Sequence, residues 1–254
     1  RIRGCEFKNR IWVSPMCQYS ADSGVVGTWH LVHLGAFATG GAGLIMVEAT
    51  AVTPEARISL GCTGIWNAIQ AEAFRPSIEF VHSQRTLIGI QLAHAGRKGS
   101  TMKPWDDHEI ASSVEGGWKT VSASSIPFKD FPIPHELSIS EIDSLIEAFV
   151  AAAKRAVSVG FDVIEIHAAH GYLFHQFLSP LTNKRTDQYG GALTNRFKFL
   201  LNTAAAIRNS IPEDMPLFVR ISATDWVSGG WDLKDAIELC KELKEVGVDL
   251  IDVS

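Results

Sequence analysis

Two histidines and a tyrosine follow one apolar run closely enough to act on a single substrate. Residues 161–172 read FDVIEIHAAHGY, and the β-branched residues of 163–166 predict a short buried strand. His167, His170 and Tyr172 come where this strand should give way to a loop. Parallel α/β sheets build their active sites at the carboxyl ends of their strands. We therefore expect these three side chains to form the centre of the site.

The histidine pair admits three interpretations. It could consist of satisfied polar residues near a sheet edge, without a chemical role. It could ligate a metal ion, as in a metal-dependent barrel hydrolase, but Asp162 and Glu165 lie further back on the strand and no third ligand is obvious. It could also aim two donors at one carbonyl oxygen and stabilise an enolate. Tyr172 is a general acid only if its phenol is held near that substrate, and otherwise a wall of the pocket.

The length and composition favour one large domain, with two smaller domains as the alternative. The 254 residues are 46% hydrophobic and 20% charged, with a net charge of −5. The mild acidity argues against nucleic acid or a membrane surface as a partner, and no apolar run reaches the ~20 residues of a membrane helix. The four cysteines are scattered without a CxxC pair, which argues against a zinc ribbon, an iron–sulfur site or a disulfide framework and favours a reducing cytoplasm.

Strand-like apolar runs alternate with helical patterns along the chain. We expect strands at residues 11–13, 44–47, 87–90, 163–166, 217–221 and 248–253. We expect helices at residues 29–39, 70–83, 140–159, from 194 onward, and 232–246. The strands are apolar on both faces, which is typical of a parallel sheet covered by helices. A doubly wound sheet and a (β/α)8 TIM barrel both fit, but no GxGxxG follows any strand, which weakens the dinucleotide-binding version.

Polar residues predict where two of these helices begin. Ser140 is expected to cap its helix, with Asp143 three residues on as the capping-box partner, and Gly160 is expected to end it. Thr194 is the expected cap of the next helix, after the polar stretch 183–191.

A long irregular segment, at about residues 98–138, interrupts the single domain 1–254. Loops of this length inside compact domains are usually lids, binding loops or disordered, and aromatic residues argue against disorder. We expect a lid that packs on itself, with substrate selection as the alternative. The aromatic residues concerned are Trp105, Trp118, Phe128 and Phe131.

The last expected strand, residues 248–253, has no helix after it. A barrel has eight βα units, so this interpretation leaves roughly the last two units outside the chain. The chain also opens Arg1-Ile2-Arg3 without a methionine, so a short upstream segment is expected too. We expect an incomplete barrel from a longer protein.

Six motifs, each at a strand end or an adjoining loop, together resemble the old yellow enzyme family. These are FMN-dependent ene-reductases built on a (β/α)8 barrel. The cysteine of the first motif is similar to the thermophilic-like branch, which includes bacterial xenobiotic reductases. The resemblance covers essentially the whole chain and rests on the order of the motifs. They are SPMCQY at 14–19, VEA at 47–49, QLAHAGR at 91–97, HAAHGY at 167–172, RTDQYGG at 185–191 and FVR at 218–220.

The resemblance implies an enzyme that takes electrons from NAD(P)H through FMN. Hydride would pass from reduced flavin to the activated C=C of an α,β-unsaturated carbonyl compound (an enone or enal) or a related xenobiotic. His167 and His170 would hold the substrate oxygen, Tyr172 would protonate the α-carbon, and Tyr19 would line the substrate pocket. The implied cofactor-binding residues are Ser14, Pro15, Met16, Cys17, Ala49, Gln91 and Arg220.

The implied cofactor contacts have distinct physical roles. Arg220 would face the flavin pyrimidine edge, where a cation stabilises the reduced ring, although a structural salt bridge is the alternative. Gln91 would pair with the same ring, since its amide both donates and accepts. Cys17 would tune the flavin potential, unless it is simply a small buried residue. Ala49 would let the ring approach the backbone.

Two further expectations concern the rest of the protein. The FMN phosphate usually lies on loops after the seventh and eighth barrel strands, which this chain lacks. The resemblance also implies a homo-oligomer in the full-length form. A non-enzymatic alternative remains beside these, namely a degenerate barrel fragment without a cofactor.

Overall fold

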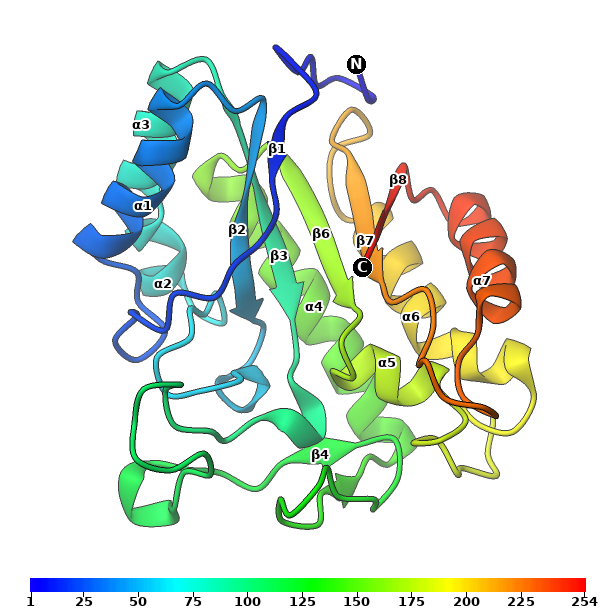
Figure 1. The fold of residues 1–254 in the computed structure, drawn as a ribbon. Helices are drawn as coiled ribbons and strands as arrows, with labels where there is room; N and C mark the ends of the chain where they lie inside the picture. The colour runs from blue at the N-terminus through cyan, green and yellow to red at the C-terminus, as the bar shows by residue number, and fades with distance from the viewer.

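The structure, a computed structural model that describes all residues 1–254, contains a curved parallel sheet covered by helices on one face (Figure 1). Its order is β1-β2-β3-β6-β7-β8, and every neighbouring pair is parallel. Because each strand lies beside the previous one, the sheet has barrel topology and not the reversed order of a doubly wound sheet. The strands are β1 (Trp12–Val13), β2 (Leu44–Ala51), β3 (Leu87–Ala93), β6 (Val163–Ala168), β7 (Leu217–Ile221) and β8 (Leu250–Val253).

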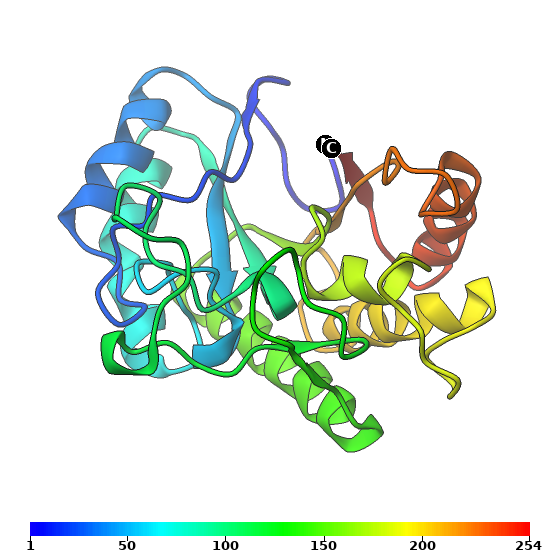
Figure 2. The same ribbon diagram turned by 60° about the horizontal axis from the view of Figure 1, so that its bottom comes forward.

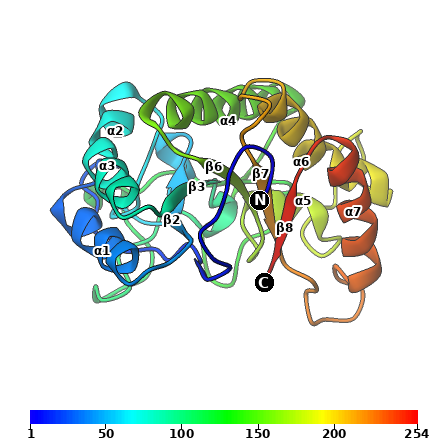
Figure 3. The same ribbon diagram turned by 90° about the horizontal axis from the view of Figure 1, so that it is seen from above.

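The helices form an arc around the outside of the sheet, while the inner face opens toward the two chain ends (Figure 3). No helix combines the length and the apolar character needed to span a membrane. The helices are α1 (Thr28–Thr39), α2 (Ala68–Ala73), α3 (Arg75–Ser83), α4 (Ile139–Val159), α5 (Leu173–Leu178), α6 (Leu193–Arg208) and α7 (Leu233–Glu245), with short 3-10 turns η1 (Pro54–Ala56), η2 (Gly96–Lys98) and η3 (Ser113–Glu115).

The core lies between the sheet and this arc of helices. Ile164 and Ile166 of β6 belong to the main cluster of buried apolar side chains, which they share with Phe149 of α4. Val163 and Phe218 belong to a second, small cluster. Because successive strand residues point to opposite faces, this division places odd-numbered residues of β6 on the inner face and even-numbered ones against the helices.

The six expected strands are all present, but one of the expected helices is divided into two separate helices. The helix predicted at 70–83 is broken at Phe74, which ends α2 and begins α3. Pro76 lies in the first turn of α3, where its missing N–H costs nothing. The hydrophobic pattern alone runs through this break, which explains the wrong prediction.

Both predicted helix caps are wrong by about two residues. Ser138, not Ser140, caps α4: its hydroxyl accepts from the Glu141 N–H, and the Glu141 carboxylate accepts from the Ser138 N–H. Ser140 and Asp143 have the same spacing, so the pattern could not distinguish the two. Helix α6 starts at Leu193 without a side-chain cap, so Thr194 lies inside it. Gly160 ends α4 in the left-handed conformation, as predicted.

The segment 98–138 lies across the carboxyl ends of the strands, drawn in green in Figure 2. It is not wholly irregular, because η3 and a small parallel pair, β4 (Val121–Ser122) and β5 (His135–Glu136), lie within it. Helix α5, directly after the His-Ala-Ala-His-Gly-Tyr motif, was also absent from the sequence prediction. Two-residue strands and a six-residue helix are too short to show a period.

The corrected α4 cap can be tested by stability measurements. Ser138→Ala removes the hydroxyl that accepts the Glu141 N–H, so it should lower the free energy of unfolding by about 1 kcal/mol. Ser140→Ala, the matched control, should change it by less than about 0.5 kcal/mol. Urea unfolding of both variants measures this, and equal effects would show that the cap is not specific to Ser138.

Candidate active site

Strand register brings the polar residues of three motifs together on the inner face. Glu165 pairs with Gln91 of β3, and His167 pairs with Arg220 of β7. Arg220 in turn pairs with Asp252 of β8. Residues that pair across parallel strands share a face, so these five side chains form two adjacent layers at the carboxyl end of the sheet.

The three rings predicted to carry the chemistry do converge. The ring centroids of His167 and His170 are 5.0 Å apart, and those of His167 and Tyr172 are 5.1 Å apart. His170 (φ 60°) and Gly171 (φ 72°) are consecutive left-handed residues that turn the chain sharply after β6. This turn folds Tyr172 back toward His167, so three residues spread over six positions form one group.

His167 is held as a neutral hydrogen-bond donor. Its Nδ1 accepts from the Ala169 N–H at 3.3 Å, so the single proton of the neutral ring lies on Nε2. Burial lowers the pKa of His167 well below its ordinary value, and the neighbouring His170 and Arg220 lower it further. The ring can therefore offer an N–H to an oxygen without carrying a charge.

His170 and Tyr172 are in different environments. The exposed His170 ring has its Nε2 2.5 Å from the Ser254 hydroxyl, and burial followed by the Arg220 charge lowers its pKa. Burial raises the pKa of Tyr172, so its phenol keeps its proton at neutral pH. A neutral phenol beside two neutral imidazoles can donate a proton to a nearby carbon or oxygen.

Arg220 and Gln91 leave polar atoms free below these rings. The buried Arg220 Nε has no hydrogen-bond partner, although Asp252 Oδ2 is 3.3 Å away. The Gln91 amide donates to Glu165 Oε1 at 2.8 Å, which leaves its carbonyl oxygen without a partner. Burial, then the charge of Asp252, raises the pKa of Glu165 to about 8, so that carboxyl is largely neutral at pH 7.

This donor and acceptor set fits the edge of a flavin ring. A free guanidinium N–H and a free amide oxygen match the alternating acceptors and donors of the pyrimidine edge. Ala49 lies beside Gln91 in register, and its small side chain leaves room above the sheet. The unpartnered buried Arg220 Nε is the observation that favours a bound group here.

The SPMC motif lies alongside this edge. Ser14 and Pro15 line a cavity of about 370 Å³ together with Glu165 and Asp252. Met16, the next residue of the motif, is 44% exposed. Ser14 and Pro15 thus lie beside Glu165 and Asp252, while the Met16 side chain is largely open to solvent.

Cys17 contacts a second cysteine that the sequence did not connect with it. A hydrogen bond to Cys62, followed by burial, raises the pKa of Cys17, so it is a thiol at neutral pH. Both cysteines are free. Cys62 has its own contacts with the Ser59 backbone N–H and hydroxyl.

Glu48 fixes the segment that follows Cys17. A bulge between Val47 and Ala49 interrupts the register of β2 at this residue. One carboxylate oxygen of Glu48 accepts from the Gln18 N–H, and the other lies 3.3 Å from His30 Nε2. Bulges commonly re-aim a side chain near an active site, and here the bulge anchors the predicted cofactor-binding loop.

A pocket of about 460 Å³ opens beside the converging rings. Tyr19 and Tyr172 line it from the sheet side, and Phe128 and Phe131 line it from the segment 98–138. Trp105 packs edge-on against Tyr19 with ring centroids 5.9 Å apart. Phe128 and Phe131 thus face the pocket as well as each other, whereas Trp118 packs on Arg57 outside the lid. Both self-packing and contact with a substrate are compatible with this placement.

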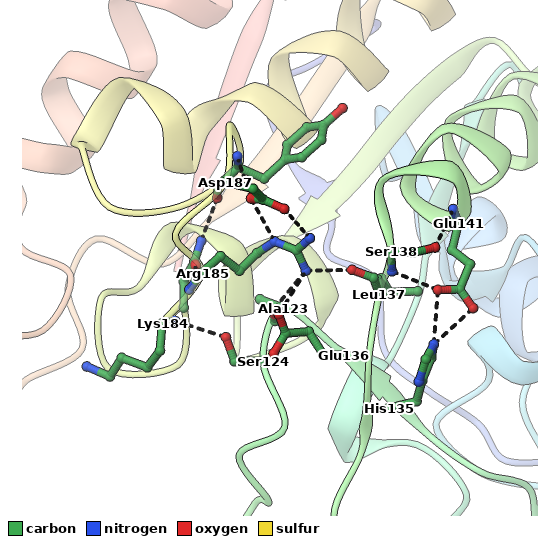
Figure 4. Close-up of polar contacts among 12 residues, drawn as sticks. Ala123, Ser124, His135, Glu136, Leu137, Ser138, Glu141, Lys184, Arg185 and Asp187 are labelled. Carbon is green, nitrogen blue, oxygen red and sulfur yellow. Dashed lines mark hydrogen bonds and ion pairs between the residues drawn. The ribbon is translucent and has the colours of Figure 1, made fainter.

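A buried arginine holds this lid in place (Figure 4). One guanidinium nitrogen of Arg185 donates to the Ala123 and Leu137 carbonyls, at 3.1 and 2.6 Å. The other nitrogens bind the Asp187 carboxylate, whose pKa is lowered mainly by these hydrogen bonds. Arg185 therefore joins two stretches of the lid to the loop before α6.

A histidine–aspartate pair supports the site from behind. His175 Nδ1 accepts from the Gly171 N–H, and its Nε2 lies 2.7 Å from Asp225 Oδ1. Burial alone would raise the pKa of Asp225, but hydrogen bonds from His175, Ser179 and the Trp231 backbone outweigh it, and the net shift is downward. Sequence reasoning missed this pair because its members are fifty positions apart and carry no motif of their own.

The metal interpretation of the histidines finds no support. No group of three histidine, cysteine, aspartate or glutamate side chains is arranged so that it could hold a metal ion. Asp162, the nearest carboxylate in sequence besides Glu165, binds His82 and the Ile88 N–H instead.

The fold is a six-stranded parallel part of an α/β barrel, and two histidines and a tyrosine converge at the carboxyl ends of its strands. The sequence profile of the NADH:flavin oxidoreductase / NADH oxidase family matches residues 1–254, and the chain belongs to this family. Its members are flavin-dependent oxidoreductases that use FMN with NAD(P)H as reductant. The resemblance to the old yellow enzyme family is thereby confirmed.

Individual relatives agree with this assignment. The chain is 46% identical to an NADH:flavin oxidoreductase of Gibberella zeae, covering 100% of this chain and 65% of the relative. It is 47% identical to an NADPH dehydrogenase of Geobacillus thermodenitrificans, covering 99% of this chain and 70% of the relative. The solved old yellow enzyme homologue of Zymomonas mobilis superposes with a TM-score of 0.84 at 29% identity, over 100% of this chain and 71% of that one. The chain thus spans roughly two thirds of these relatives.

Buried neutral histidines predict a loss of stability in acid. Burial lowers the pKa of His94 from 6.5 to about 3, and its Nδ1 accepts from the Gly96 N–H. Between these values the unfolded chain binds a proton that the folded chain does not, so stability falls as the pH drops below 6.5. Each such histidine contributes about 1.4 kcal/mol per pH unit.

His94→Asn keeps an acceptor for the Gly96 N–H but does not titrate. Urea unfolding between about pH 4.5 and 5.5 should therefore give a free energy of unfolding that depends on pH less steeply than in the wild type, by close to one proton. An unchanged slope would contradict the assignment of His94 as a buried neutral group.

The role of Arg185 in the lid can be tested by proteolysis. Arg185→Met leaves the Ala123 and Leu137 carbonyls and the Asp187 carboxylate unpaired, at a cost of about 3 kcal/mol or more. Brief chymotrypsin digestion of the folded variant should cut within residues 98–138 much faster than in the wild type. Lys184→Met, the control, changes the exposed residue before Arg185 and should leave the cleavage rate unaltered. Equal cleavage rates in the two variants would show that Arg185 does not hold the lid in place.

Proposed function

We propose that this chain is the larger part of an FMN-dependent NAD(P)H oxidoreductase that reduces the activated C=C of α,β-unsaturated carbonyl compounds or related xenobiotics. The observation that carries the proposal is the convergence of His167, His170 and Tyr172 beside the free polar atoms of Gln91 and Arg220. Family membership supports the flavin chemistry, and the neutral proton-donating rings support the choice of substrate.

The proposed contacts with FMN are of two kinds, polar contacts with one edge of the ring and apolar or backbone contacts beside it. Arg220 and Gln91 would hold the pyrimidine edge of FMN, with Cys17 and Ala49 beside the ring. Ser14, Pro15 and Met16 would contact it through backbone and small apolar surfaces. Fixing a cation at an edge that becomes negative on reduction favours the reduced state.

The protein's own residues would then guide the substrate. When bound, FMN supplies the hydride that it has received from NAD(P)H. His167 Nε2–H would donate to the carbonyl oxygen of the substrate, and the His170 ring, whose centroid lies 5.0 Å from that of His167, would donate to the same oxygen. Two donors on that oxygen stabilise the negative charge that develops there. Tyr172, kept protonated by burial, delivers the proton to the α-carbon, and Tyr19 bounds the pocket.

The proposal extends to the whole enzyme. About two further βα units would close the sheet into a (β/α)8 barrel and would carry the FMN phosphate site. The open inner face in Figure 3 and the greater length of the relatives support this. We also propose a homo-oligomer in the cytoplasm, where four free thiols are stable.

Visible spectroscopy tests the proposed cofactor and reaction together. The protein with its barrel complete should be yellow, should bleach when NADPH is added without oxygen, and should regain its colour with cyclohexenone. A colourless protein that takes up no added FMN would refute the proposal.

Tyr172→Phe should affect only one of the two steps of the proposed reaction, which are reduction of FMN by NADPH and reoxidation of FMN by the enone. Removing the phenolic proton should slow reoxidation by cyclohexenone by about 10²-fold or more, while reduction by NADPH changes little. Tyr189→Phe, at a buried tyrosine that packs edge-on against Phe177 of α5, should slow neither step. Equal slowing of both half-reactions in Tyr172→Phe would contradict its role as the proton donor.

A further inference from the structure

Lys98 places a cation inside the pocket beside Tyr172. It ends η2, directly after β3, and it lines the 460 Å³ pocket. Its ammonium donates to the His170 carbonyl oxygen at 2.9 Å. The same ammonium lies 5.0 Å from the ring centroid of Tyr172 and 4.8 Å from that of Phe128. The lysine is thus clamped between two aromatic rings at the centre of the site.

This cation has no anionic partner in the chain. Among the ion pairs of the structure none involves Lys98. The Phe128 ring is also approached by Arg97, at 5.9 Å, and by Lys129, at 5.2 Å. Burial and these two cations lower the pKa of Lys98, and Glu109 offsets this only in part. An anion bound here would relieve both the burial and the repulsion.

The pocket also has acidic residues, but they lie on its outer wall. Asp106, Asp107 and Glu109 line the pocket and are all exposed, so water screens their charges. The Asp106 carboxylate is already engaged by the Lys103 N–H. The Lys98 ammonium thus lies between the Tyr172 and Phe128 rings, and none of these exposed carboxylates forms an ion pair with it.

We propose that Lys98 is a specificity-determining residue that selects substrates bearing a carboxylate next to the activated alkene. The inference rests on the proposed function, because Tyr172 and the His167–His170 pair must hold the reacting part of the same molecule. The carboxylate pairs with the Lys98 ammonium between the Tyr172 and Phe128 rings. The preferred substrate class is an α,β-unsaturated ketone or aldehyde that is also a carboxylic acid.

The test compares one acid with its uncharged ester. 4-Oxopent-2-enoate and its methyl ester share the enone and differ in charge. Isothermal titration with the FMN-loaded protein, without NADPH, measures binding of each, and steady-state assays with NADPH give KM for each. Wild type should bind the acid at least about tenfold more tightly than the ester, because only the acid can pair with the half-buried Lys98 ammonium.

Two variants separate charge recognition from a structural tether. Lys98→Gln keeps an N–H donor for the His170 carbonyl but removes the charge, and it should abolish the acid preference. Lys98→Arg should retain most of it. Lys129→Gln, the control, removes a charge from an exposed lysine beside the same Phe128 ring. The preference of this variant for the acid over the ester should stay within about threefold of that of the wild type, because water screens the Lys129 charge.

The outcomes distinguish this inference from the proposed function. A wild type that binds acid and ester equally, a Lys98→Gln variant that keeps the preference, or an equal loss in Lys129→Gln would overturn the role of Lys98. Failure of NADPH to reduce the bound enone would instead refute the proposed reaction, while the titrations would still decide whether Lys98 recognises the carboxylate.

Discussion

The register of β6 against its two neighbours is the constraint on which the site depends. It sets Glu165 opposite Gln91 and His167 opposite Arg220 on the inner face. A slip of one residue would turn all of these toward the helices and bring Ile164 and Ile166 inward. The apolar packing of those isoleucines against the helices therefore fixes the polar layer above. The core and the chemistry are specified by alternate residues of one strand.

Burial then keeps three groups of the site neutral. His167 is uncharged, Tyr172 keeps its proton, and Glu165 is largely protonated near pH 7. Arg220 lies in an ion pair with Asp252, and Lys98 places a second cation beside the Tyr172 ring. In a site of low dielectric, charges act strongly on whatever is bound beside them.

The sequence predicted the strands and the converging residues because both depend on local signals. Apolar β-branched runs mark the strands, and strand ends mark the site. The predicted start of α4 was wrong because two serines, Ser138 and Ser140, have equivalent capping patterns in the sequence. The partners Cys62 and Asp225 could not be predicted, because each meets its counterpart only through the tertiary fold. The contact of Lys98 with Phe128 could not be predicted either, because Phe128 belongs to a lid whose sequence has no regular period.

The central claim is that the sheet register holds the Arg220 cation, with its free Nε, at the edge of the flavin. The most direct measurement is the two-electron midpoint potential of bound FMN in the wild type and in Arg220→Met. The potential should fall by about 30 mV or more, equivalent to about 1.4 kcal/mol, because the reduced ring loses its fixed cation. Arg220→Lys, which keeps the charge, should lie between the two. A potential in Arg220→Met that equals or exceeds that of the wild type would contradict the account.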